Sequence, residues 1–266
     1  MKKAVLIMGI TLLIIFSLNS IGLAKMVINT NRLDEGIITV TSTSELTKKV
    51  KVRIIKDDKE VTYDFSKSNE EVPYALTFGN GTYEVKVFEN VVDNKYKVVT
   101  SKSSIKLELK DEKEVFLNQT EEVNWNEEQR YIKLAKELTK DAKTDLEKVE
   151  LIYDYLTKNF KYDYSKIYGL ESSYRPNLET LYDEMTGICY DYSAIFAGML
   201  RSLGIPTKLV KGYSVQDMST YHAWNSVLVD GEWKMVDTTN DAYRVQNNIN
   251  VDMFKSDDSF IVSYEY

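Results

Sequence analysis

The chain of 266 residues contains a single cysteine, Cys189, and a single histidine, His222. A thiol becomes a strong nucleophile when a neighbouring imidazole takes its proton, and a carboxylate that holds the imidazole assists this transfer. Asp237 follows His222 along the chain and could supply that carboxylate. These three residue types predict nucleophilic catalysis by a thiol, provided that the fold brings them together.

Cys189 is expected at the start of a helix. Gly187 interrupts the chain two residues before it, and the apolar residues that follow describe a mostly buried helix that Gly204 and Pro206 end. The unpaired N–H groups and the dipole at a helix N-terminus favour a thiolate over a thiol. The same N–H groups can stabilise an oxyanion, so we predict that the Cys189 backbone contributes to an oxyanion site.

His222 and Asp237 lie on two predicted strands that the Asp-Gly dipeptide at 230–231 joins, a sequence typical of a two-residue hairpin turn. Such a turn pairs Val229 with Glu232. In this register His222 and Asp237 are diagonal neighbours on one face of the hairpin, with Cα atoms roughly 7–8 Å apart. A slip of one residue would place them on opposite faces, so the expected contact depends on the turn.

Residues 116–266 are predicted to form the domain that carries this chemistry. Apolar residues recur at helical spacing from about residue 131, and Thr144 to Glu147 has the pattern of a capping box that starts a second helix. After Pro206 the pattern changes to strands, which we expect at 207–215, 222–229 and 232–239. Helical and strand patterns therefore occupy separate stretches of this domain.

Residues 25–115 are predicted to form an antiparallel β-sandwich module. Short segments rich in Val, Ile, Thr and Tyr, several of them alternating apolar and polar residues, are separated by turn sequences. The expected strands are 36–42, 50–55, 60–65, 82–90, 95–99 and 104–109. Because the module contains neither cysteine nor histidine, we expect it to have a structural or binding role.

Two stretches resemble the core of the transglutaminase-like superfamily: GICYDYSAIFAGMLRSLGIPTKLVKGY, which begins at Gly187, and HAWNSVLVDGEWKMVDTTND, which begins at His222. The resemblance covers roughly residues 126–255. It implies a papain-like α+β domain in which helices pack on an antiparallel sheet. It also implies that Cys189 is the nucleophile, that His222 is the general base and acid, and that Asp237 orients His222, with no cofactor and no metal ion.

Members of this superfamily use a further side chain upstream of the nucleophile to assist the oxyanion. The candidates in this chain are Tyr174, Tyr182 and Asn177, and the sequence does not choose among them. Two aromatic residues, Tyr190 and Trp224, are expected to line the cleft, with plain packing as the alternative for Trp224. Asp191 is expected to cap or brace the start of the helix that begins with Cys189.

Residues 1–24 have the pattern of a secretory signal peptide. Lys2 and Lys3 precede an apolar run, and small residues at Gly22 and Ala24 suit a signal peptidase. The apolar run of about 15 residues is shorter than the roughly 20 needed to span a bilayer, although an uncleaved anchor is the alternative. The net charge of −7 and the lack of a basic cluster argue against nucleic acid and acidic lipid as partners.

We therefore expect a secreted or cell-surface enzyme that forms a thioester on an amide carbonyl of a protein or peptide, including cell-wall amides. Water as acceptor gives hydrolysis, and an amine gives transamidation or crosslinking. Two alternatives remain open: an inactive scaffold or binding module, and an intermolecular disulfide through Cys189. Contact with a membrane is expected only through an uncleaved signal peptide.

Overall fold

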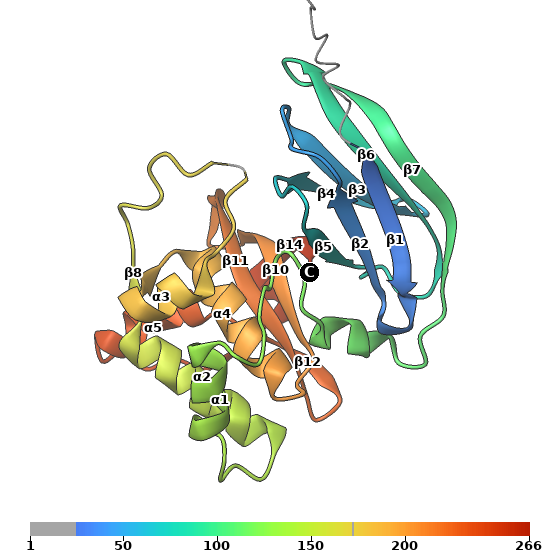
Figure 1. Ribbon diagram of the computed structural model, residues 1–266. Helices are drawn as coiled ribbons and strands as arrows, with labels where there is room; N and C mark the ends of the chain where they lie inside the picture. The colour runs from blue at the N-terminus through green and yellow to red at the C-terminus, as the bar shows by residue number, and fades with distance from the viewer. Residues whose placement is uncertain (1–24, 172) are drawn as a thin grey trace, which may run out of the picture.

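The computed structural model describes residues 25–171 and 173–266 (Figure 1). The predicted signal peptide, residues 1–24, lies outside the described residues. Within the described ranges, no helix combines the length and the apolar character that crossing a bilayer would require.

Seven strands form two antiparallel sheets in the N-terminal part of the chain, which we call the sandwich. One sheet has the order β1-β2-β5, with β1 at Met26–Arg32, β2 at Ile37–Ser42 and β5 at Glu71–Ala75. The other has the order β4-β3-β6-β7, with β3 at Val50–Lys56, β4 at Lys59–Phe65, β6 at Gly81–Val92 and β7 at Lys95–Leu107. Buried and outward-facing residues alternate along β3, β4 and β6, and most of the buried side chains of both sheets belong to one core.

The sandwich differs from the prediction in three of its strands. The two strands expected at 95–99 and 104–109 are a single strand, β7, whose pairing with β6 shifts register at three places. Pairing with β6 continues through the serine-rich middle of β7, although its polar residues suggest a break in the sequence. β1 and β5 were not predicted, and Pro73 within β5 is tolerated because β5 is an edge strand.

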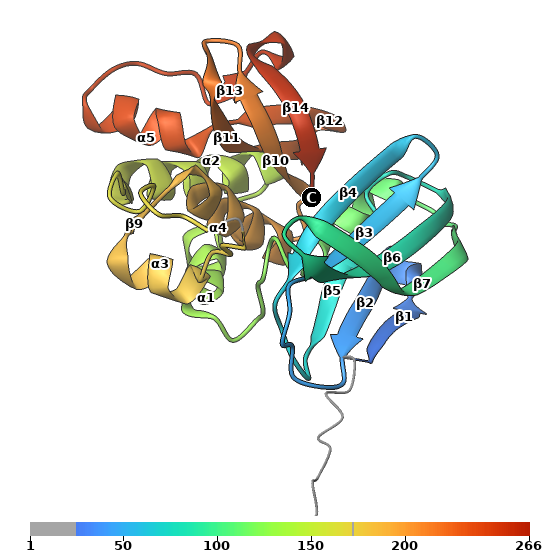
Figure 2. The same cartoon turned by 90° about the horizontal axis from the view of Figure 1, so that it is seen from above.

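The C-terminal part combines helices with a five-stranded antiparallel sheet of order β13-β12-β11-β10-β14 (Figure 2). Its strands are β10 at Thr207–Ser214, β11 at Asp217–Val229, β12 at Glu232–Val236, β13 at Phe254–Lys255 and β14 at Phe260–Glu265. The helices are α1 at Arg130–Leu138, α2 at Asp145–Asn159, α3 at Leu178–Glu184, α4 at Cys189–Ser202 and α5 at Thr238–Gln246. Short strands β8 (Lys161–Tyr162) and β9 (Thr186–Gly187) pair in parallel. The predicted α+β class is confirmed.

Helix α4 lies at the centre of this C-terminal part. It contacts α1, α2 and α5 as well as β10 and β11, and most of its residues are buried. The predicted capping box begins α2: the Thr144 hydroxyl accepts a hydrogen bond from the Glu147 backbone N–H, and the Glu147 carboxylate accepts one from the Thr144 backbone N–H. Local sequence signals therefore predict the starts of helices α2 and α4.

The predicted strand 232–239 is wrong at its end. Strand β12 stops at Val236, and Asp237 is the N-cap of α5, which the sequence analysis missed. The Asp237 side chain accepts a hydrogen bond from the Asn240 backbone N–H at 3.1 Å, which satisfies one free donor of the helix start. Two threonines then open α5, and their β-branched side chains resemble strand residues in the sequence.

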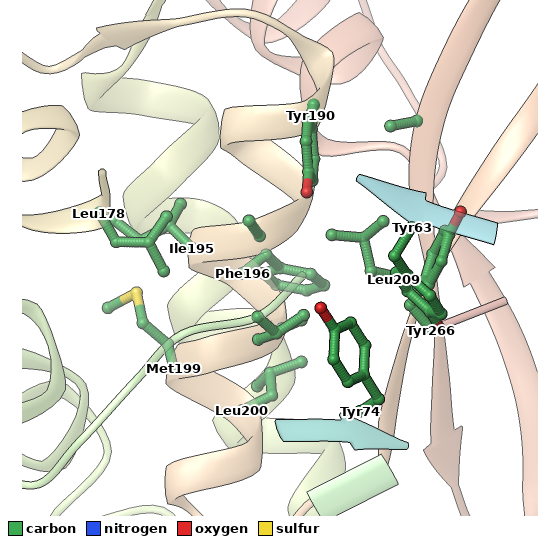
Figure 3. Close-up of a cluster of buried hydrophobic side chains, with 14 of the residues drawn as sticks. Tyr63, Tyr74, Leu178, Tyr190, Ile195, Phe196, Met199, Leu200, Leu209 and Tyr266 are labelled. Atoms are coloured by element: carbon green, nitrogen blue, oxygen red, sulfur yellow. The ribbon is translucent and has the colours of Figure 1, made fainter. Parts of the chain in front are cut away.

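The sandwich and the C-terminal part share one hydrophobic core. Tyr63 and Tyr74 of the sandwich have ring centroids 4.7 Å apart, and Tyr63 packs edge-on against Tyr266 beyond the end of β14. Figure 3 shows these rings facing Phe196 and Leu200 on α4. The 3-10 helix η2 (Glu112–Leu117) and an irregular segment connect the two parts, and we keep the limits 25–115 and 116–266 as proposed domains.

Arg201 in the last turn of α4 joins three distant segments. Its buried guanidinium donates hydrogen bonds to the backbone carbonyls of Thr207 at 2.9 Å, Asn118 at 2.7 Å and Tyr266 at 2.8 Å. A buried carbonyl that loses its donor retains the full cost of desolvation. Arg201 therefore stabilises the junction between the helix, the connecting segment and the sheet.

We expect Arg201→Met to lower the free energy of unfolding by about 3 kcal/mol, because three buried carbonyls lose a charged donor. Urea unfolding followed by fluorescence measures this change. The matched control is Arg130→Met, because Arg130 pairs with Glu179 and Asp183 at the surface, where such pairs contribute at most about 1 kcal/mol. Similar small losses in both variants would contradict the role of Arg201.

Candidate active site

Cys189 is the first residue of α4 and is half-buried. Gly187 precedes it in β9, where a side chain would not fit. A Cβ atom at position 187 would lie 2.6 Å from the Leu181 side chain and 2.7 Å from the Cβ of Asp191. Glycine is therefore needed here for close packing, which delivers the chain to the helix end without a positive φ angle.

Asp191 holds the start of α4, as predicted. Its carboxylate is fully buried and accepts hydrogen bonds from the Ile188 backbone N–H at 2.9 Å and from Lys166 Nζ at 2.8 Å. The Tyr174 hydroxyl donates a third hydrogen bond to the same carboxylate. Asp191 thus ties the loop after β8 to the turn that carries Cys189.

The three side chains considered for the oxyanion all have other contacts. Tyr174 donates its hydroxyl to Asp191, and Tyr182 on α3 presents its ring to the guanidinium of Arg130, 5.5 Å away. Asn177 is the N-cap of α3 and accepts a hydrogen bond from the Thr180 backbone N–H. Their role in an oxyanion site stays a prediction.

The hairpin register agrees with the prediction. Val229 pairs with Glu232, and the pairing continues to Asn225 and Val236. Asp237 leaves the sheet at that point, yet its carboxylate Oδ2 remains 2.8 Å from Nε2 of His222. The turn sequence therefore predicts the contact between the imidazole and the carboxylate, although Asp237 reaches it from a helix N-cap.

Asp237 is 1% exposed, and it accepts hydrogen bonds from the Asn240 backbone N–H and, at 2.6 Å, from the Asn240 side chain. Burial raises the pKa of Asp237, but the charge and hydrogen bond of His222 outweigh this effect and lower it below the usual value. The carboxylate is therefore ionised at neutral pH. Asn240 fixes the direction in which it points.

The imidazole of His222 is influenced by residues from two elements. Burial lowers the pKa of His222, but the charge and hydrogen bond of Asp237 raise it, and so do a side-chain hydrogen bond and the charge of Cys189. The net result is a pKa of about 10, so the imidazolium is the main form at neutral pH. His222 thus contacts Asp237 directly and is close enough to Cys189 for the thiol to act on its pKa.

Trp224 supports His222 from one side of β11. The His222 and Trp224 rings are stacked with centroids 6.0 Å apart, and Trp224 stacks on Phe260 at 4.4 Å. Gly212 on β10 leaves room for this arrangement, because a Cβ atom there would lie 2.1 Å from the Ile261 carbonyl oxygen and 2.9 Å from the Trp224 ring. Trp224 is 1% exposed, so it lies behind the imidazole and does not face solvent.

Tyr162 is a neighbour of the thiol that the sequence analysis missed. It lies on β8, which pairs with Gly187 just before Cys189. Burial raises the pKa of Tyr162 to about 12, with a further contribution from the charge of Cys189. The only sequence signal is its place directly after α2. In the described ranges, no group of three or more His, Cys, Asp and Glu side chains could hold a metal ion.

Comparison with known proteins finds a family model that matches the part of the chain that carries this site. The model of the Transglutaminase-like superfamily matches residues 132–238. Kyphoscoliosis peptidase from Homo sapiens is 30% identical over 115 residues, which are 40% of this chain and 17% of that protein, and the Mus musculus protein is 29% identical over the same length. The match thus spans about a sixth of these relatives.

Two solved structures have a distant likeness to the chain. The periplasmic domain of TgpA from Pseudomonas aeruginosa has a TM-score of 0.40 and 14% identity, and the match covers 85% of this chain and 97% of that one. Red sea bream transglutaminase has a TM-score of 0.31 and 13% identity, with 76% and 47% covered. Residues 132–238, which match the superfamily model, include Cys189, His222 and Asp237.

Proposed function

We propose that this protein is a thiol enzyme that forms a thioester on an amide carbonyl through Cys189, His222 and Asp237. The observation that carries the proposal is the convergence on one imidazole of a buried carboxylate, 2.8 Å from Nε2, and the only thiol of the chain. The superfamily of the core domain includes both cysteine proteases and transglutaminases, and both use this chemistry.

The proposed reaction begins from a thiolate beside an imidazolium. The Cys189 sulfur attacks the carbonyl carbon, and the carbonyl oxygen becomes an oxyanion near the backbone N–H groups that start α4. The C–N bond then breaks as His222 gives its proton to the leaving nitrogen. The neutral imidazole next takes a proton from water or an amine, which attacks the thioester and releases Cys189. Asp237 keeps the ring oriented throughout.

We propose a protein or peptide amide as the substrate, with cell-wall peptides included. The name of the human relative, Kyphoscoliosis peptidase, favours hydrolysis as the first fate to test. The signal-like pattern of residues 1–24 supports action outside the cytoplasm. Transamidation differs only in the acceptor, because the same thioester can react with an amine.

Mass spectrometry of a glutamine-containing protein substrate mixed with a primary amine separates the possible reactions. We expect wild type to cleave the backbone, with amine incorporation and deamidation as the other distinguishable mass changes. Cys189→Ala should abolish all three, because the thioester cannot form. Backbone cleavage that survives in Cys189→Ala would contradict the proposal, and wild type without any of the three would favour an inactive scaffold.

Iodoacetamide should alkylate Cys189 faster than a free model thiol near pH 6–7, because the imidazolium favours the thiolate. Asp237→Asn should slow this alkylation about tenfold or more, since the carboxylate that stabilises the imidazolium is lost. The control is Asp241→Asn, one turn along α5, where the carboxylate contacts Tyr153 and Lys255 instead of His222. Equal slowing in the two variants would sink the assignment of Asp237.

The ion pair of His222 and Asp237 should make stability depend on pH. The folded pKa of His222, about 10, lies above its unfolded value of about 6.5. The contribution to stability is therefore fully present below about pH 6.5 and is lost as the pH rises through about 10. Urea unfolding should show a difference between wild type and His222→Gln that shrinks over this range. A constant difference would argue against the pair.

A further inference from the structure

A second cluster of charged side chains is buried next to the candidate active site. At its centre is Glu122, which is 4% exposed and lies in the connecting segment, before the start of the matched region. Lys211 Nζ donates a hydrogen bond to this carboxylate at 2.8 Å, and a guanidinium nitrogen of Arg175 lies 3.2 Å from it. The Tyr190 hydroxyl also donates a hydrogen bond to the Glu122 carboxylate.

These partners keep the carboxylate charged in spite of its burial. Burial raises the pKa of Glu122, but Lys211 and Arg175, together with the hydrogen bond from Tyr190, bring it below the usual value. Lys211 also places its ammonium 3.6 Å from the centroid of the Tyr190 ring. Because loss of one partner leaves an uncompensated buried charge, the positions of all four side chains depend on one another.

Two of these contacts involve the elements that carry Cys189 and His222. Tyr190 follows Cys189 in the first turn of α4, so its hydroxyl holds the helix end that carries the nucleophile. Lys211 lies on β10 and pairs with Ala223, the neighbour of His222 on β11. Cys189 is also close enough for its charge to act on Lys211. One carboxylate therefore braces both the element with the thiol and the sheet with the imidazole.

The sandwich in turn holds the segment that carries Glu122. The backbone N–H of Glu121 donates a hydrogen bond to the carbonyl of Pro73 on β5 at 2.9 Å. Tyr63 and Tyr74 of the sandwich line the same small surface pocket as Glu122. Figure 3 shows these two rings beside Tyr266, with Tyr190 above them on α4. The position of Glu122 thus depends on the packing of the sandwich against the C-terminal part.

We propose that Glu122 is a positioning residue for Cys189 and His222, and that the sandwich contributes to catalysis by holding Glu122 in place. This inference rests on the proposed function and extends it, because it assigns a role in the reaction to a residue outside the matched core domain. Glu122 acts through Tyr190 and Lys211, and it does not touch the reacting atoms.

The test compares Tyr190→Phe with Tyr192→Phe in the full chain. Both tyrosines are buried on α4, but the Tyr192 hydroxyl has no hydrogen-bond partner among residues 25–171 and 173–266. We expect Tyr190→Phe to slow iodoacetamide alkylation of Cys189 about tenfold at pH 7, the size expected for one hydrogen bond to a charged group, and to move the midpoint of its pH profile upward. Tyr192→Phe should stay within about twofold of wild type, because it removes no such bond.

Glu122→Gln should slow alkylation further, since it disturbs both Tyr190 and Lys211, and urea unfolding identifies any loss of the fold. If that variant does not fold, the tyrosine pair still decides the question. Equal rates of Cys189 alkylation in folded Tyr190→Phe and Tyr192→Phe would overturn the positioning role of Glu122. Because alkylation needs no amide substrate, that result would leave the proposed function standing, whereas a wild type without turnover would count against the function alone.

Discussion

The ion pair between His222 and Asp237 is the interaction on which the rest of the site depends. Both groups are largely buried, and a buried charge is tolerated only when it is paired and hydrogen-bonded. The groups around the pair therefore have to satisfy its hydrogen bonds and fill the space beside it. Asn240 satisfies the remaining acceptor capacity of Asp237, and Trp224 stacks on the other side of the imidazole. The result is an imidazole that stays protonated at neutral pH.

The other side of the site is organised by a second buried carboxylate. Asp191 accepts hydrogen bonds from the turn before α4 and from two side chains of the loop after β8. This carboxylate fixes the helix start, and with it the direction of the N–H groups near Cys189. Two acidic residues therefore hold the two halves of the site: Asp237 orients His222, and Asp191 orients the helix start that carries Cys189. The charges of both are compensated by specific partners, as burial requires.

The sandwich is continuous with the C-terminal part through a shared aromatic core and through the segment with Glu122. Domains joined only by small, polar contacts are free to move relative to one another. Here the border also includes the buried cluster of Glu122, Lys211 and Arg175, whose geometry is costly to disturb. The sandwich is thus more than an appended module, because its packing reaches the first turn of α4.

The sequence by itself determined the features that depend on local interactions. The capping box of α2, the start of α4 at Cys189 and the register of the hairpin between β11 and β12 follow from neighbouring residues, and the register predicts the approach of His222 to Asp237. The α+β class was implied by the resemblance to the transglutaminase-like superfamily, and the structure confirms it.

The tertiary structure alone decided what depends on residues far apart in the chain. Asp237 caps a helix where β-branched threonines suggested a strand, and β7 runs on through a polar stretch because β6 pairs with it. Gly187 and Gly212 are required by close packing, for which the sequence carries no signal. The cluster around Glu122 joins residues up to 89 positions apart. Such contacts form only when burial brings the segments together, since each charge needs its partner once water is excluded.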